Sequence, residues 1–192
     1  MIRIFCLPLV TLLLGFSLNL TPKQPLKPTA YPEHLTGAFT GGFGEETCRS
    51  CHFDYDLNPE GGSLSVSGIG EEISPGEILN IQITVRRNDL GKAGFQLSAR
   101  FTDGSQAGRF KIKDNERVMF TEAVPDSLQY IQHSEAGTKP VKSGVNSWTV
   151  AWQAPESIEK AIIFNVAANA ANGDASEFGD FIYAEEIRVN RK

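Results

Sequence analysis

The chain has 192 residues, which corresponds to about one domain. Its 41% hydrophobic and 21% charged residues are typical of a globular protein and exclude a polytopic membrane protein or a disordered chain. The net charge of -5 comes without a basic run, so we expect no nucleic acid partner.

Residues 1–20 have the layout of an export signal. Arg3 precedes a short apolar run over residues 4–16, and polar residues follow. The run is shorter than the about 20 residues that span a bilayer, so we expect the signal to be cleaved. Contact with a membrane is expected only if the signal remains uncleaved. Cys6 would leave with the signal, and Cys48 and Cys51 would remain in an oxidising compartment.

The rest of the chain divides into an N-terminal arm over residues 21–61 and a β-sandwich domain over residues 62–192. The arm is rich in Pro, Gly and Thr from Pro22 to Gly44 and has no apolar period. Two acidic residues, Glu45 and Glu46, are expected only to favour a helix N-terminus electrostatically. The arm is therefore predicted to be irregular.

Alternating apolar and polar residues after Gly62 predict about eight short strands. This number and spacing favour an all-β fold, an antiparallel β-sandwich. Trp148 and Trp152 share one face of their strand, where they are expected in the core, with contact to a porphyrin edge as the sharper alternative. The predicted strands cover residues 64–66, 78–85, 95–101, 110–112, 118–124, 148–152, 161–168 and 182–189.

One motif carries specific chemistry, the C-x-x-C-H segment from Cys48 to His52. This pattern is the attachment site of a c-type haem. On one helical turn, thiols three residues apart point the same way and can both reach the vinyl groups of one porphyrin edge. His52 would then be the proximal ligand of the iron, so the predicted cofactor is a covalent haem c held by Cys48 and Cys51.

Three other interpretations of the two cysteines stay open. They could form a structural disulfide, act as a redox dithiol, or supply half of a zinc site. Zinc is the weakest, since the sequence has no second C-x-x-C or H-x-x-x-H pair. A redox dithiol would need a helix N-terminus in a βαβ context, which the strand pattern does not supply.

From about residue 35 to residue 187 the sequence resembles the choice-of-anchor V domain, a bacterial exported module related to the Reeler domain of eukaryotic surface proteins. The resemblance implies a β-sandwich with a cytochrome-c-type motif on an N-terminal extension. It also implies bacterial export to the periplasm, the outer cell surface or the medium. No anchoring segment follows the last predicted strand, so we expect a free protein. The segments that carry the resemblance are 36–38, 44–52, 74–76, 94–97, 130–133, 148–155, 169–174 and 179–183.

The second axial position of the iron has several candidate ligands. His133 is the preferred one, because it ends the Tyr-x-x-His segment of the resemblance and follows an alternating apolar stretch. Met119 and His34 are weaker candidates, an open or water-bound position remains an alternative, and a surface histidine at a strand end is the plain interpretation of His133.

Two function hypotheses follow. The first is an exported monohaem electron carrier with a redox partner that the sequence does not name. The second is a cell-envelope interaction module in which Cys48 and Cys51 are structural. We expect no enzyme, since the sequence contains no G-x-S-x-G elbow and no nucleotide-binding glycine pattern. A loop with Asn172, Asp174, Glu177 and Asp180 could bind calcium, although an Asn-Gly-Asp turn is the favoured interpretation.

Overall fold

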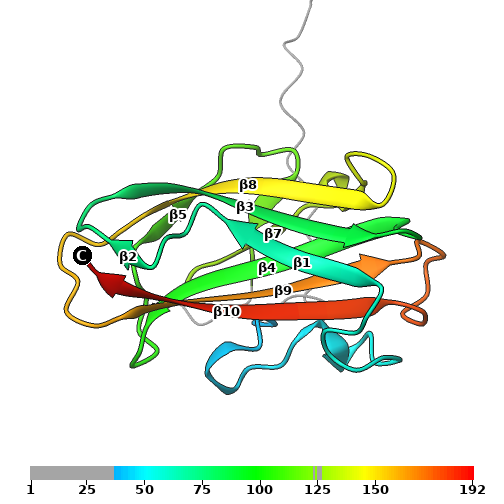
Figure 1. The fold of residues 1–192 in the computed structure, drawn as a ribbon, viewed down its shortest axis with the longest axis horizontal. Coiled ribbons are helices and arrows are strands. Elements are labelled where there is room, and N and C mark those ends of the chain that lie inside the picture. The colour runs from blue at the N-terminus through cyan, green and yellow to red at the C-terminus, as the bar shows by residue number, and fades with distance from the viewer. Residues whose placement is uncertain (1–36, 123, 125–126) are drawn as a thin grey trace, which may run out of the picture.

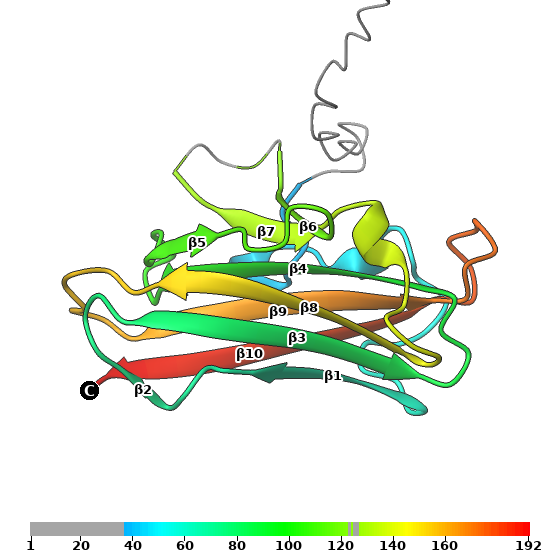
Figure 2. The same ribbon diagram turned by 90° about the horizontal axis from the view of Figure 1, so that it is seen from above.

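The computed structural model describes residues 37–122, 124 and 127–192. These residues form two stacked β-sheets, and their only helices are short 3-10 turns (Figures 1 and 2). The predicted export signal and the first part of the predicted arm, residues 1–36, lie outside the described residues, as does His34. Within the described part, no helix is long and apolar enough to cross a membrane.

The smaller sheet has four strands in the order β1-β3-β8-β5, and all its pairs are antiparallel. Its inward residues alternate with an outer face of mostly polar residues, which is the period expected of a half-buried strand. The bounds are β1 (Gly62–Ser67), β3 (Ile78–Arg87), β8 (Val145–Gln153) and β5 (Arg109–Lys111).

The larger sheet has six strands in the order β2-β10-β9-β4-β7-β6. All its pairs are antiparallel except the short parallel pairing of β2 with β10, which makes the sheet mixed. The bounds are β2 (Glu72–Ile73), β10 (Phe181–Arg191), β9 (Ile162–Ala171), β4 (Lys92–Phe101), β7 (Tyr130–His133) and β6 (Val118–Phe120).

The core lies between the two sheets and is built from their inward apolar side chains. Trp152 packs edge-on against Phe164, and Trp148 packs against Phe95 across the sandwich. Each indole N–H donates to a backbone carbonyl, so these large side chains are buried without an unpaired donor. Both tryptophans are therefore core residues, as predicted, and neither lies where a porphyrin edge could reach it.

The predicted β-sandwich is confirmed, with two differences in its strands. β2 and β7 were not predicted as strands. β2 has only two residues, too few to show an alternating period, and residues 130–133 of β7 were interpreted only as a segment of the family resemblance. The strand predicted over residues 118–124 ends at Phe120, where β6 stops. The missed β7 matters most, since it carries His133.

Residues 37–61 run along the outer face of the larger sheet. Figure 1 shows this segment, blue to cyan, beside β9 and β10. Its backbone closes a small loop through the bridge between Thr40 and Thr47, and Asn58 pairs with the backbone of Ile182 and Ala184 in β10. The described part of the predicted arm, residues 37–61, is thus irregular, but it is bound to the sheet at several points.

Candidate functional site

A buried charged cluster fixes the arm to the sheet. Glu45 of the arm contacts the guanidinium of Arg100 in β4 and accepts a hydrogen bond from the hydroxyl of Tyr130 in β7. The side chains of Arg100 and Glu45 are only 6% and 15% exposed. Burial and the neighbouring Glu45 raise the pKa of Tyr130 well above its usual value, so the phenol stays protonated and donates.

Two further contacts hold the arm close to the sheet. The amide group of Gln96 in β4 accepts from the backbone N–H of Phe39 at 2.6 Å and donates to the carbonyl of Gly37 at 2.7 Å. Gly42 is buried directly over Asn165 of β9, where a Cβ atom would collide with the asparagine side chain. A glycine is therefore favoured where the backbone of the arm packs directly on this side chain.

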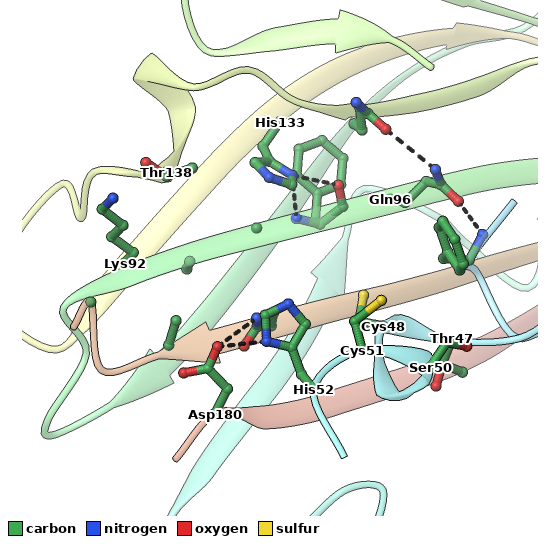
Figure 3. Close-up of a pocket in the computed structure, with 18 of the residues that line it drawn as sticks. Thr47, Cys48, Ser50, Cys51, His52, Lys92, Gln96, His133, Thr138 and Asp180 are labelled. Atoms are coloured by element: carbon green, nitrogen blue, oxygen red, sulfur yellow. Dashed lines mark hydrogen bonds and ion pairs between the residues drawn. The ribbon is translucent and has the colours of Figure 1, made fainter. Parts of the chain in front are cut away.

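The C-x-x-C-H segment follows this anchored loop and forms one tight turn. Its 3-10 helix, η3 (Cys48–Ser50), begins after Thr47, whose hydroxyl accepts the N–H of Arg49 at 3.2 Å. The N–H of His52 donates to the carbonyl of Cys48 at 3.0 Å, which closes the turn. The sulfur atoms of Cys48 and Cys51 lie side by side at the pocket in Figure 3, as the predicted turn requires.

His52 is held from behind by a buried carboxylate. Its Nδ1 lies 2.8 Å from Oδ2 of Asp180, a residue that is 1% exposed. Asp180 is itself fixed by the side chain of Asn169 at 3.1 Å and by the backbone N–H of Asn172 at 3.2 Å. Contact through Nδ1 leaves Nε2 as the ring nitrogen directed away from Asp180 (Figure 3).

His133 lies across the same pocket at the end of β7. Its Nδ1 is 3.0 Å from both the N–H and the carbonyl oxygen of Phe95, so backbone groups of β4 set the orientation of the ring. The ring covers Gly94, where a Cβ atom would come within 2.5 Å of Cε1. Burial lowers the pKa of His133 below its ordinary value of 6.5, so the imidazole is neutral at neutral pH.

These residues line one pocket of about 340 Å³, within the size range of ligand-binding cavities. Cys48, Cys51, His52, His133 and Asp180 all contribute to its wall, with apolar surface from β4 and β9. The structure thus brings together all four residues of the predicted haem site. Met119 is not in this wall, although β6 pairs with β7.

The thiols and imidazoles that line the pocket fit one interpretation of the cysteines better than the others. Two thiols on one side of a turn, a following imidazole and a second neutral imidazole fit a c-type haem. Burial raises the pKa of the Cys48 thiol to about 12, which is opposite to the lowered pKa of a reactive dithiol. No cluster of three His, Cys, Asp or Glu side chains suited to a metal ion occurs in the described ranges. Both cysteines are free thiols here.

The loop over residues 172–180 contains the local turn that was the favoured interpretation of its sequence. Asp174 accepts from the backbone N–H of Ser176 and from the side chain of Asn172, as in a local turn. Asp180 points instead toward His52 and Asn169. Asn172 and Asp174 thus bond to each other within the turn, whereas Asp180 belongs to the pocket.

The interpretation of Glu45 as a residue that only favours a helix N-terminus was wrong. Its carboxylate reaches the sheet and pairs with Arg100, 55 positions further along the chain. The signal in the sequence was the polar side chains at 96, 98 and 100, which share one face of a long strand. The arm covers that face.

Replacing Glu45 with Gln is expected to destabilise the fold by about 3 kcal/mol, because the buried guanidinium of Arg100 would lose its countercharge. Urea unfolding measures the loss, and limited trypsin digestion after Arg49 reports release of the arm. Glu46→Gln is the matched control, since Glu46 is exposed. Equal stability and equal digestion of the two variants would contradict this role of Glu45.

Stability is expected to fall on acidification because of His133. A histidine with a lowered folded-state pKa contributes its full stability above its unfolded value of about 6.5 and loses it as the pH falls toward the folded value. Urea unfolding between about pH 7.5 and pH 5 should show a slope of at most about 1.4 kcal/mol per pH unit from this group. The slope should shrink in His133→Asn, and an unchanged slope would refute the assignment.

Comparison with known proteins identifies the fold. Residues 47–172 match the Reeler domain. The solved reeler domain of human F-spondin has 18% identity, with 71% of this chain and 92% of that chain covered at a TM-score of 0.49. A structure of the Reelin-N domain of F-spondin also has 18% identity, with 75% and 96% covered at a TM-score of 0.50. No curated protein matches the sequence. Because the family match spans well over half of the chain, this protein belongs to the Reeler domain family.

Proposed function

We propose that the chain is an exported interaction module that binds another protein at the cell envelope. The Reeler domain is a non-enzymatic binding module found in extracellular proteins, and membership of this family supports the proposal. The observation that carries it is the bound arm. Residues 37–61 and the larger sheet form one continuous surface that is fixed by the buried pair of Glu45 and Arg100.

A fixed surface of this kind suits recognition. Flexible segments lose conformational entropy when they bind, whereas a pre-ordered surface avoids most of that cost. The cluster around Arg100 and the close approach at Gly42 hold the arm in one position before any partner arrives.

The test is chemical cross-linking in the cells that naturally produce the chain. Formaldehyde treatment followed by purification of the tagged full-length protein should recover the same partner repeatedly. Glu45→Gln, which frees the arm, should lower the recovery at equal expression. A wild-type protein that cross-links to no partner in intact cells would refute the interaction role.

A second function, electron transfer through a covalent c-type haem, is favoured by one specific observation. The turn from Cys48 to His52 presents two thiols and an imidazole to a pocket that also contains His133. Bound there, a haem would supply a one-electron redox centre. Cys48 and Cys51 would hold it by thioether bonds, while the imidazoles of His52 and His133 would bind its iron.

In this role each residue of the pocket has a separate task. Asp180 would orient the ring of His52 and increase its basicity as a ligand through the contact with Nδ1. Burial would keep His133 in the neutral state, which is the form that binds a metal, and the backbone of Phe95 would orient its ring. The alternative role of Cys48 and Cys51 is a structural disulfide that braces the arm.

The intact mass and the visible spectrum of protein exported from a host with c-type haem maturation decide whether Cys48 and Cys51 hold a haem or form a disulfide. We expect the mass of one added haem and low-spin spectral bands. His133→Ala should retain the haem but lose the low-spin bands, and Asp180→Asn should retain the haem and raise its reduction potential. A mass lower by two hydrogens would instead establish a disulfide between Cys48 and Cys51, and the redox role would fall.

A further inference from the structure

An exposed aromatic patch lies directly beside the pocket. Phe53 follows His52, and Phe178 precedes Asp180 by two residues, so the pair His52–Asp180 is flanked by a pair of phenylalanines. The two rings meet edge to face with centroids 5.7 Å apart, yet the residues remain 56% and 50% exposed. Tyr55 and Leu57 continue the exposed apolar surface along the arm. These four residues are the aromatic patch.

The patch is one surface, although it comes from two distant segments. Asp54 accepts the backbone N–H of Gly179 at 2.8 Å, and Tyr55 stacks on Phe181 with centroids 4.1 Å apart. Asn58 then pairs with the backbone of β10. Residues 53–58 therefore lie beside residues 178–184. The exposed rings form one apolar patch, and exposed apolar patches mark interaction sites.

Most of the charged groups around the patch are carboxylates. Arg87 is an exception that lies over the ring of Phe181, but its side chain is only 14% exposed and pairs with Asp89 at 2.9 Å. Residues 52–60 and 172–180 contain no lysine or arginine, and five of their carboxylates are exposed. These carboxylates belong to Asp54, Asp56, Glu60, Asp174 and Glu177. Arg49 lies 3.7 Å from Asp56 and offsets one of them. The apolar centre is thus surrounded by a negative rim.

We propose that this surface docks a protein partner that presents an apolar side chain surrounded by lysine and arginine. The aromatic rings would bury the apolar side chain of the partner and attract its cations by cation–π interactions. The acidic rim would favour a basic partner over an acidic one. The inference rests on the proposed interaction role and names the face and the partner chemistry. It does not depend on a haem.

The first test uses a short synthetic peptide of alternating lysine and leucine as a probe, with a glutamate and leucine peptide as its counterpart. The full chain should bind the lysine peptide and not the glutamate peptide in isothermal titration. Phe53→Ala combined with Phe178→Ala should weaken binding about tenfold, whereas Ile78→Ala should not. Ile78 is the matched control, because it is also 56% exposed but lies on the smaller sheet.

The second test separates the rim from the general charge of the protein. Asp56→Asn, Glu60→Gln and Glu177→Gln together should weaken the lysine peptide about tenfold at low salt and little at high salt. The triple control Glu71→Gln, Glu116→Gln and Glu159→Gln changes the net charge equally at exposed sites elsewhere. Equal effects of the two triple variants, or no binding of the lysine peptide, would overturn the proposal.

The natural partner gives a third readout. A photo-cross-linking amino acid at position 53 should trap a basic partner in producing cells, and the same group at position 78 should not. Two results would overturn the docking face and leave the interaction role intact. In the first, formaldehyde recovers a partner that the photo-cross-linking amino acid captures only from position 78. In the second, the recovered partner is acidic. Recovery of no partner by either method, with the peptide results unchanged, would overturn only the interaction role.

Discussion

The ion pair between Glu45 and Arg100 is the interaction on which the arrangement of this molecule depends. A guanidinium on the outer face of a sheet ordinarily stays in water, but here the arm covers it and removes it from solvent. That burial is tolerated only because Glu45 supplies the countercharge and Tyr130 supplies a further hydrogen bond. Since Glu45 lies three residues before Cys48, the same contact fixes where the C-x-x-C-H turn can lie.

The pocket is assembled from three segments that meet only in the folded chain. The arm brings the cysteines and His52, the β9–β10 connection brings Asp180, and the end of β7 brings His133. The order of strands in the larger sheet makes this meeting possible, because β4 lies between β9 and β7 and presents Gly94 beneath the ring of His133. A bulkier residue at position 94 would separate the two sides of the pocket.

The features that were predictable are those with a local signal. Alternation located the long strands, the spacing of Trp148 and Trp152 placed both in the core, and the motif at Cys48 located the turn. The features that were missed depend on long-range pairing. Glu45 resembles its neighbour Glu46 in sequence, yet only Glu45 meets Arg100, and Asp180 resembles the other loop carboxylates until His52 approaches it. Polar residues that alternate along a strand usually indicate a face exposed to solvent. In β4 these polar residues are buried, because the arm covers them.

The two proposed roles use the same piece of surface, and this overlap has a physical consequence. The loop that carries Asp180 against His52 also carries Phe178 against Phe53, with Gly179 bound to Asp54 between them. A change that moves His52 therefore also strains the contact between the two rings, because both contacts join the same two segments. Linkage makes any such coupling reciprocal: a ligand at the pocket that selects the loop position favoured by the patch partner raises that partner's affinity, and the partner raises the affinity of the pocket by the same factor.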